Sequence, residues 1–189
     1  MKRLWIKTAV ALMCVASTVA CNKEESVQAD LRSTDDLSLM ERSRNPSVSG
    51  HVELDSLDEN GRYQQYSFTA VMKKDGSVRG EFQLFDTFND STRLVAHGNV
   101  ECFTIQDDGK TAWLGGVVER GMLDSTNLAG AEAYWTVVDN GEGAKADPDE
   151  ATEIVYGFDG LLAQDHCEEG LGTFVYFGPI LRSNVQVKP

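Results

Sequence analysis

The sequence of 189 residues lacks the short motifs of the common catalytic sites. It has no Gly-x-Ser-x-Gly nucleophile elbow, no His-Glu-x-x-His zinc helix, no phosphate-cradling glycine loop and no dinucleotide fingerprint. Histidine is also scarce. His51, His97 and His166 are scattered along the chain, which favours separate structural or exposed roles over a shared metal site. The usual enzyme signatures are therefore absent.

Basic residues are few compared with acidic ones. The chain has 17 Lys and Arg against 30 Asp and Glu, a formal net charge of −13. A charge of this sign repels nucleic acid phosphates and anionic membrane surfaces. We therefore exclude nucleic acid as a partner.

Long apolar runs are missing except near the N-terminus. Lys2, Arg3 and Lys7 precede an apolar run over 8–19, which is too short to span a bilayer as a stable helix. This combination predicts a signal peptide over residues 1–20. The run ends in Thr18-Val19-Ala20-Cys21, which resembles the lipobox of bacterial lipoprotein precursors.

The lipobox resemblance implies a lipid anchor at Cys21. In that family a diacylglycerol is attached to the thiol, the chain is cut before the cysteine, and the new amino group is often acylated, for example with palmitate. Two or three acyl chains hold a protein firmly to a membrane. We expect a cell-envelope location, with the outer membrane favoured by Asn22 if the host is Gram-negative. The alternative is a cysteine in a plain signal or a short membrane anchor.

Cysteines are few, and the predicted processing commits half of them. We expect Cys14 to be removed with the signal peptide and Cys21 to be lipidated. Cys102 and Cys167 then remain in a compartment where thiols oxidise. We expect them to form one disulfide, which closes a long loop and nominally contributes about 4 kcal/mol. Two buried free thiols are the alternative. Because the signal holds three basic residues and no acidic one, the mature net charge becomes −16.

Two further segments follow the signal. Residues 21–46 are polar and charged with isolated leucines, too little apolar surface for a core, and we expect a disordered, lipid-anchored flexible tether. Residues 47–189 are long enough to form one domain.

The domain sequence alternates apolar and polar residues in short runs, the period of half-buried strands. Asp75-Gly76 separates two such runs and predicts a hairpin. A second hairpin is expected from 94–105 to 111–118, with further strands at 132–138, 153–157 and 184–187. No long stretch has helical periodicity. The pattern predicts an all-β fold, an antiparallel β-sandwich or open barrel of about 7–9 short strands.

An acidic segment between two predicted strands offers oxygen ligands for a cation. Calcium takes about six to eight oxygens from carboxylates, amides and carbonyls. The spacing does not match an EF-hand, and a solvated turn in which Asp and Asn bind their own backbone is the simpler interpretation. The candidate calcium ligands are Asp139, Asn140, Glu142, Asp147 and Asp149.

Trp113 and Trp135 lie in predicted strands. Burial in the core is the favoured role for both, and an exposed sugar-stacking platform is the alternative. Turn acids such as Asp86, Asp107 and Asp108 have no fixed geometry in the sequence, so no acid and base pair is assigned.

Several segments of the domain resemble an uncharacterised family of secreted bacterial β-domains. The resemblance spans most of residues 50–189, and segment 121–130 departs from it. It implies core and turn roles for the shared glycines, tryptophans and cysteine, and no known activity. The segments are 98–102 (Gly-Asn-Val-Glu-Cys), 111–117 (Thr-Ala-Trp-Leu-Gly-Gly-Val), 135–143 (Trp-Thr-Val-Val-Asp-Asn-Gly-Glu-Gly), Asp147-Pro148-Asp149, Cys167 and 185–187.

Three hypotheses for the function follow. The first is a non-enzymatic, lipid-anchored envelope protein that displays a β-sandwich module for an envelope protein or polysaccharide. The second is a calcium-binding β-domain that uses the 139–150 loop. The third is an envelope hydrolase whose carboxylates converge from separate loops.

Overall fold

The computed structural model describes residues 45–55, 57, 61–88, 93–143, 145–158, 160, 163–172, 174, 177–180 and 184–189. The predicted signal peptide, Cys21 and the tether as far as residue 44 lie outside these residues. Within the described part of the chain, no helix combines the length and the hydropathy needed to cross a membrane.

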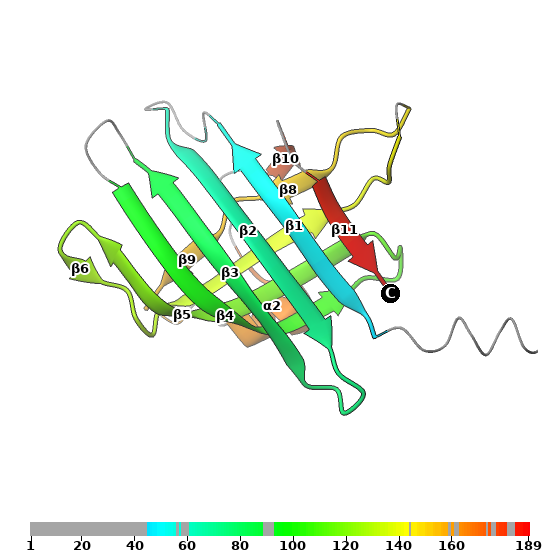
Figure 1. Cartoon of the computed structure of the whole chain (residues 1–189), viewed down its shortest axis with the longest axis horizontal. Helices are drawn as coiled ribbons and strands as arrows, with labels where there is room; N and C mark the ends of the chain where they lie inside the picture. The colour runs from blue at the N-terminus through cyan, green and yellow to red at the C-terminus, as the bar shows by residue number, and fades with distance from the viewer. Residues whose placement is uncertain are drawn as a thin grey trace, which may run out of the picture. The chain divides into compact units, whose positions relative to one another are not determined.

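The described residues form one antiparallel sheet that curls into a half-barrel (Figure 1). This confirms the all-β prediction. Nine strands pair consecutively in the order β10-β8-β7-β5-β4-β3-β2-β1-β11, while β6 pairs with β5 and β9 with β7. The elements are β1 (Ser47–Leu54), β2 (Tyr63–Met72), β3 (Val78–Thr87), β4 (Arg93–Ile105), β5 (Thr111–Leu123), β6 (Thr126–Asn127), β7 (Glu132–Val138), β8 (Glu150–Thr152), β9 (Val155–Gly157), α2 (Ala163–Glu169), β10 (Phe177–Pro179) and β11 (Asn184–Lys188).

The predicted hairpins are confirmed. Strands β2 and β3 are joined through Asp75-Gly76, where Gly76 has a φ of 81°. The Asp75 carboxylate accepts a hydrogen bond from the backbone N–H of Ser77 at 3.0 Å. Glycine reaches this left-handed backbone region without a steric cost, which is why the Asp-Gly pair identified the turn.

The core lies on the inner face of the sheet, and Trp135 of β7 is at its centre with no exposed surface. The Trp135 ring centroid lies 5.6 Å from that of Phe68 on β2 and 5.4 Å from that of Phe82 on β3. These contacts join the front of the half-barrel to β7, which lies behind β1–β4 in Figure 1. The core role predicted for Trp135 is confirmed.

Two glycines let the sheet bend next to these rings. Gly50 pairs with Phe68 across β1 and β2, and Gly98 pairs with Phe82 across β3 and β4. A Cβ on Gly98 would lie 2.4 Å from the Phe82 ring and 2.3 Å from the Val117 carbonyl oxygen. Only a residue without a side chain permits this approach, and such glycines are a common source of sheet curvature.

Two β-bulges in the pairing of β4 with β5 reverse the alternation of side chains. One lies between His97 and Gly98 and leaves Glu119 as the extra residue, so Glu119 and Arg120 are both exposed. The other lies between Val100 and Cys102, and it turns Cys102 away from the inner core. Bulges of this kind re-aim individual side chains without ending the strand pairing.

The second bulge positions the disulfide. Cys102 of β4 is bonded to Cys167 of α2, with Cα atoms 6.1 Å apart. Helix α2 packs closely on the outer side of β5, because a Cβ on Gly115 would lie 2.5 Å from the Ala163 carbonyl oxygen. The sequence predicted the cysteine pair but not this helix, which at seven residues is too short to show a periodic pattern.

Candidate functional site

The outer face of the sheet carries a continuous row of polar side chains. Strand pairing places His51 opposite Ser67, Ser67 opposite Gln83, and Gln83 opposite His97. With a neighbouring row they line a groove of about 660 Å³. We call it the outer groove. Its lining side chains are Ser49, His51, Ser67, Thr69, Glu81, Gln83, His97, Asn99, Glu119, Arg120, Asn184 and Gln186, above Gly50, Phe68, Phe82 and Gly98.

The place of the outer groove follows from the strand alternation. On β1–β4 the apolar residues point toward Trp135, so the polar residues between them point to the opposite side. Figure 1 views the molecule from that side, with β1–β4 in front. The groove crosses six strands, from β11 through β1, β2, β3 and β4 to β5.

Hydrogen bonds hold several groove side chains in place. The Nε2 atoms of Gln65 and His51 lie 3.1 Å apart, and those of Gln83 and His97 lie 3.3 Å apart. Because the amide nitrogen of glutamine only donates, each imidazole Nε2 is the acceptor. Asn99 Nδ2 donates to Glu119 Oε1 at 2.7 Å. The groove is therefore lined by oriented donors and acceptors.

An apolar strip borders the outer groove. Phe85, Val95 and Met122 are direct cross-strand neighbours on β3, β4 and β5. Val95 and Met122 are each 48% exposed. A smaller hollow of about 290 Å³ connects Phe85 and Val95 with His51, Gln65, Ser67 and Gln83. The outer face thus combines a hydrogen-bonding row with apolar contact area.

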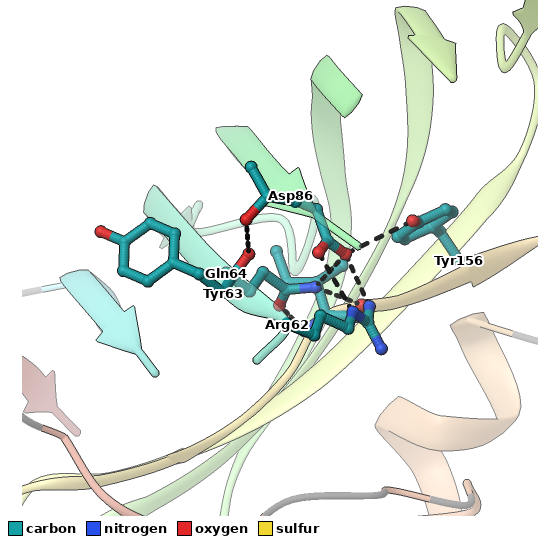
Figure 2. A network of polar contacts seen from close by, with 7 residues as sticks. Arg62, Tyr63, Gln64, Asp86 and Tyr156 are labelled. Carbon is teal, nitrogen blue, oxygen red and sulfur yellow. Dashed lines mark hydrogen bonds and ion pairs between the residues drawn. The ribbon is translucent and has the colours of Figure 1, made fainter. Parts of the chain in front are cut away.

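A second polar cluster lies on the inner side, around the buried carboxylate of Asp86 (Figure 2). Arg62 donates from Nε to Asp86 Oδ1 at 3.1 Å and from Nη2 to Oδ2 at 2.6 Å. Gln64 Nε2 and the Tyr156 hydroxyl also donate to Oδ2, at 2.9 and 3.4 Å. Gln64 further pairs with both backbone groups of Ile154, at 2.5 and 3.2 Å. The cluster therefore links the residues that precede β9 to strands β2 and β3 by hydrogen bonds.

The electrostatics of this cluster agree with a structural role. Burial by itself lowers the pKa of Arg62, but the hydrogen bond and charge of Asp86 more than offset it, and the pKa is raised. The pKa of Tyr156 is also raised, first by burial and then by the Asp86 charge. Asp86 has no exposed surface, and four donor groups contact its two oxygens. It therefore offers nothing to an incoming substrate.

Of the candidate calcium ligands, Asp139 and Asp149 bind backbone N–H groups. Asp139 accepts from Gly141 N at 2.8 Å and from Val187 N at 2.9 Å. Asp149 accepts from Asn140 N at 2.9 Å and from Val185 N at 2.8 Å. Each carboxylate thus accepts a hydrogen bond from its own loop with one oxygen and from strand β11 with the other.

The other three predicted ligands are more peripheral. Asn140 donates from Nδ2 to the Pro148 carbonyl oxygen at 2.7 Å, Glu142 accepts from Gln186 Nε2 at 3.0 Å, and Asp147 is exposed. Among the described residues, no three His, Cys, Asp or Glu side chains are grouped to hold a metal ion. These contacts resemble a turn in which Asp and Asn side chains bind the backbone. This is the interpretation that the sequence favoured over a calcium site.

The three histidines lie in two different places. His51 and His97 line the outer groove, whereas His166 of α2 is buried against Tyr134, with ring centroids 4.9 Å apart. His166 Nδ1 faces the Leu171 carbonyl oxygen, and Nε2 lies 3.1 Å from the Trp135 carbonyl oxygen. Burial lowers the pKa of His166, against the raising effect of these two carbonyls.

Neither tryptophan forms the sugar-stacking platform considered from the sequence. Trp135 is enclosed in the core. Trp113 is only partly exposed, because the end of α2 covers it: a Cβ on Gly170 would lie 2.5 Å from its ring, and the His166 ring centroid is 6.2 Å away. Both tryptophans therefore have packing roles, as the sequence favoured.

The outer groove contains two carboxylates, Glu81 and Glu119, and both are exposed. Sequence reasoning missed them and the rest of the groove, because outward polar residues on a strand look like ordinary solvated positions. The sequence does show outward polar residues on consecutive strands. Recognising that they form one row requires the register in which the strands pair. Glu119 depends in addition on a bulge that period-2 patterns do not reveal.

Comparison with known proteins finds no match to the chain among protein-family models, curated proteins or solved structures.

Proposed function

We propose that this chain is a non-enzymatic, lipid-anchored binding protein of the cell envelope, and that it binds its ligand in the outer groove. The observation that carries the proposal is the row of oriented polar side chains across six strands, with an apolar strip beside it. Ligand sites commonly combine apolar contact area with a few placed polar groups.

The lipobox supports the envelope part of the proposal. Cys21 would hold the mature chain at a membrane, in the outer membrane of a Gram-negative host. The 25 residues from Cys21 to Asn45 span at most about 90 Å when extended. A mature net charge of −16 disfavours contact between the domain and anionic lipid headgroups. Such a tether lets the groove reach ligands beyond the membrane surface.

Binding is favoured over hydrolysis by where the carboxylates lie. The acids of the outer groove, Glu81 and Glu119, are exposed on an open sheet face. The buried acids Asp86 and Glu153 have 0% and 2% exposed surface, out of reach of a substrate. Acid and base chemistry usually needs carboxyl groups with distinct environments inside one accessible site.

Sedimentation with envelopes tests the proposal. The mature chain with Cys21→Ser, which removes the anchor, is mixed with envelope fragments of the source cells. Thr69→Arg fills the groove from an exposed position, and Gln164→Arg adds the same side chain at an exposed position of α2. We expect the parent and Gln164→Arg to sediment with the envelope and Thr69→Arg to remain in solution. Equal sedimentation of all three would refute a role for the groove.

A further inference from the structure

The outer groove has the length of an extended polymer. Neighbouring strands lie about 4.8 Å apart, so the five spacings from β11 to β5 give a groove of about 24 Å. It runs across the strands on an open face and is not enclosed. A compact small molecule would leave most of this length empty, whereas a linear chain would contact it throughout.

The groove also has the chemistry of an uncharged polar ligand. Hydroxyls, carboxamides and imidazoles dominate its lining, and nearly all of them can exchange hydrogen bonds with hydroxyl groups. Arg120 is its one arginine or lysine, against the carboxylates of Glu81 and Glu119. Phosphate, sulfate or uronate groups along a polymer would find no surplus of positive charge here. The lining therefore disfavours anionic polymers.

The apolar strip suits sugar rings. Each pyranose presents C–H faces as well as hydroxyls, and Val95 and Met122 supply exposed apolar area directly beside the polar row. A chain lying in the groove can place hydroxyls on Gln83 or His97 and ring faces toward Phe85 and Val95.

A peptide fits less well. Extended peptides usually bind by adding a strand to an open sheet edge. The groove crosses the middle of the sheet, where β1–β4 are already paired on both sides. The free side of β11 is also occupied, because Val185 N and Val187 N donate to Asp149 and Asp139.

We propose that the outer groove binds a neutral glycan chain that lies across the strands from β11 to β5. This inference rests on the proposed function and adds the class of ligand to it.

Selective destruction of the envelope ligand tests the inference. Envelope fragments are treated with protease or with periodate, which cleaves vicinal diols in sugars, and binding of the mature Cys21→Ser chain is compared with untreated fragments. We expect binding to survive protease, to fall about tenfold or more after periodate, and to change little with added salt, since no ion pairs carry it. Gln164→Arg should behave like the parent chain in every arm.

The opposite results separate the two proposals. Binding that protease abolishes and periodate spares would overturn the glycan inference and leave a groove that binds protein. Binding that high salt abolishes would replace the neutral glycan with a charged ligand. If untreated envelopes retain Thr69→Arg as well as the parent chain, the groove itself is not the site, and both proposals fail together.

Discussion

The Asp149 carboxylate accepts a hydrogen bond from the backbone N–H of Val185, 36 residues further along the chain, at 2.8 Å. Asp139 makes the equivalent contact with Val187 at 2.9 Å. These are the N–H groups of β11 that face away from β1. Side-chain carboxylates thus occupy the free side of an edge strand, which is otherwise prone to pair with other chains.

Asp149→Asn should destabilise the domain by about 1–3 kcal/mol. The asparagine amide has only one acceptor oxygen, so it cannot accept from both Asn140 N and Val185 N. Its own N–H₂ group would face one of these two donors. Urea unfolding of the mature Cys21→Ser chain measures the change. Asp147→Asn is the matched control at an exposed position of the same loop and should shift the midpoint little. Equal shifts for both variants would contradict the assigned contact.

Calcium should have little effect on stability if these contacts hold the loop by themselves. The oxygens of Asp139 and Asp149 already accept backbone N–H groups, so a cation would have to displace them. We expect the same melting temperature in chelator and in millimolar calcium. A calcium-dependent rise that Asp139→Ala removes would instead establish the calcium site that the sequence offered as an alternative.

Arg62→Met should cost roughly 3–5 kcal/mol, because it leaves the buried Asp86 carboxylate without its cation. The double variant Arg62→Met with Asp86→Leu should recover part of this loss, since it removes the isolated charge. Arg93→Met, at an exposed position of β4, provides the control. Denaturant unfolding compares the three variants with the parent chain. A similar small loss for Arg62→Met and Arg93→Met would show that the ion pair contributes nothing.

Stability should fall as the pH drops below about 6.5, in part through His166. The pKa of its imidazole is lowered in the folded chain from an ordinary 6.5, mainly by burial. Between the folded and unfolded pKa values the unfolded chain binds more protons. The contribution of His166 to the free energy of unfolding is therefore fully present above pH 6.5 and declines below it. His166→Gln should flatten this part of the profile. An unchanged slope in His166→Gln would contradict the assignment.

Much of the fold was accessible from local patterns. The strand predicted over 132–138 coincides with β7, the Asp75-Gly76 hairpin forms as expected, and Trp135 lies in the core. These features depend on alternation, turn chemistry and hydrophobicity within short windows. The pairing of Cys102 with Cys167 also followed, because the predicted processing would leave no other cysteines.

The site depended on long-range geometry that local patterns do not contain. The outer groove exists because six strands align their outward residues, and Glu119 joins it through a bulge. The acidic loop looked like a cation site because the sequence does not show that β11 supplies N–H groups to Asp139 and Asp149. Helix α2 was missed because it is held by the disulfide and by packing on Gly115, and its own sequence has no periodic pattern.

The histidine ring signals of the mature Cys21→Ser chain test the central claim most directly. His51 and His97 line the outer groove, and His166 is a buried residue of α2, so the three rings report two separate regions of the domain. NMR spectra are recorded while solubilised envelope polysaccharide is added. The account predicts that the His51 and His97 signals shift while His166 stays in place, and that Thr69→Arg abolishes the shifts. Movement of His166 alone, or no movement of His51 and His97, would contradict it.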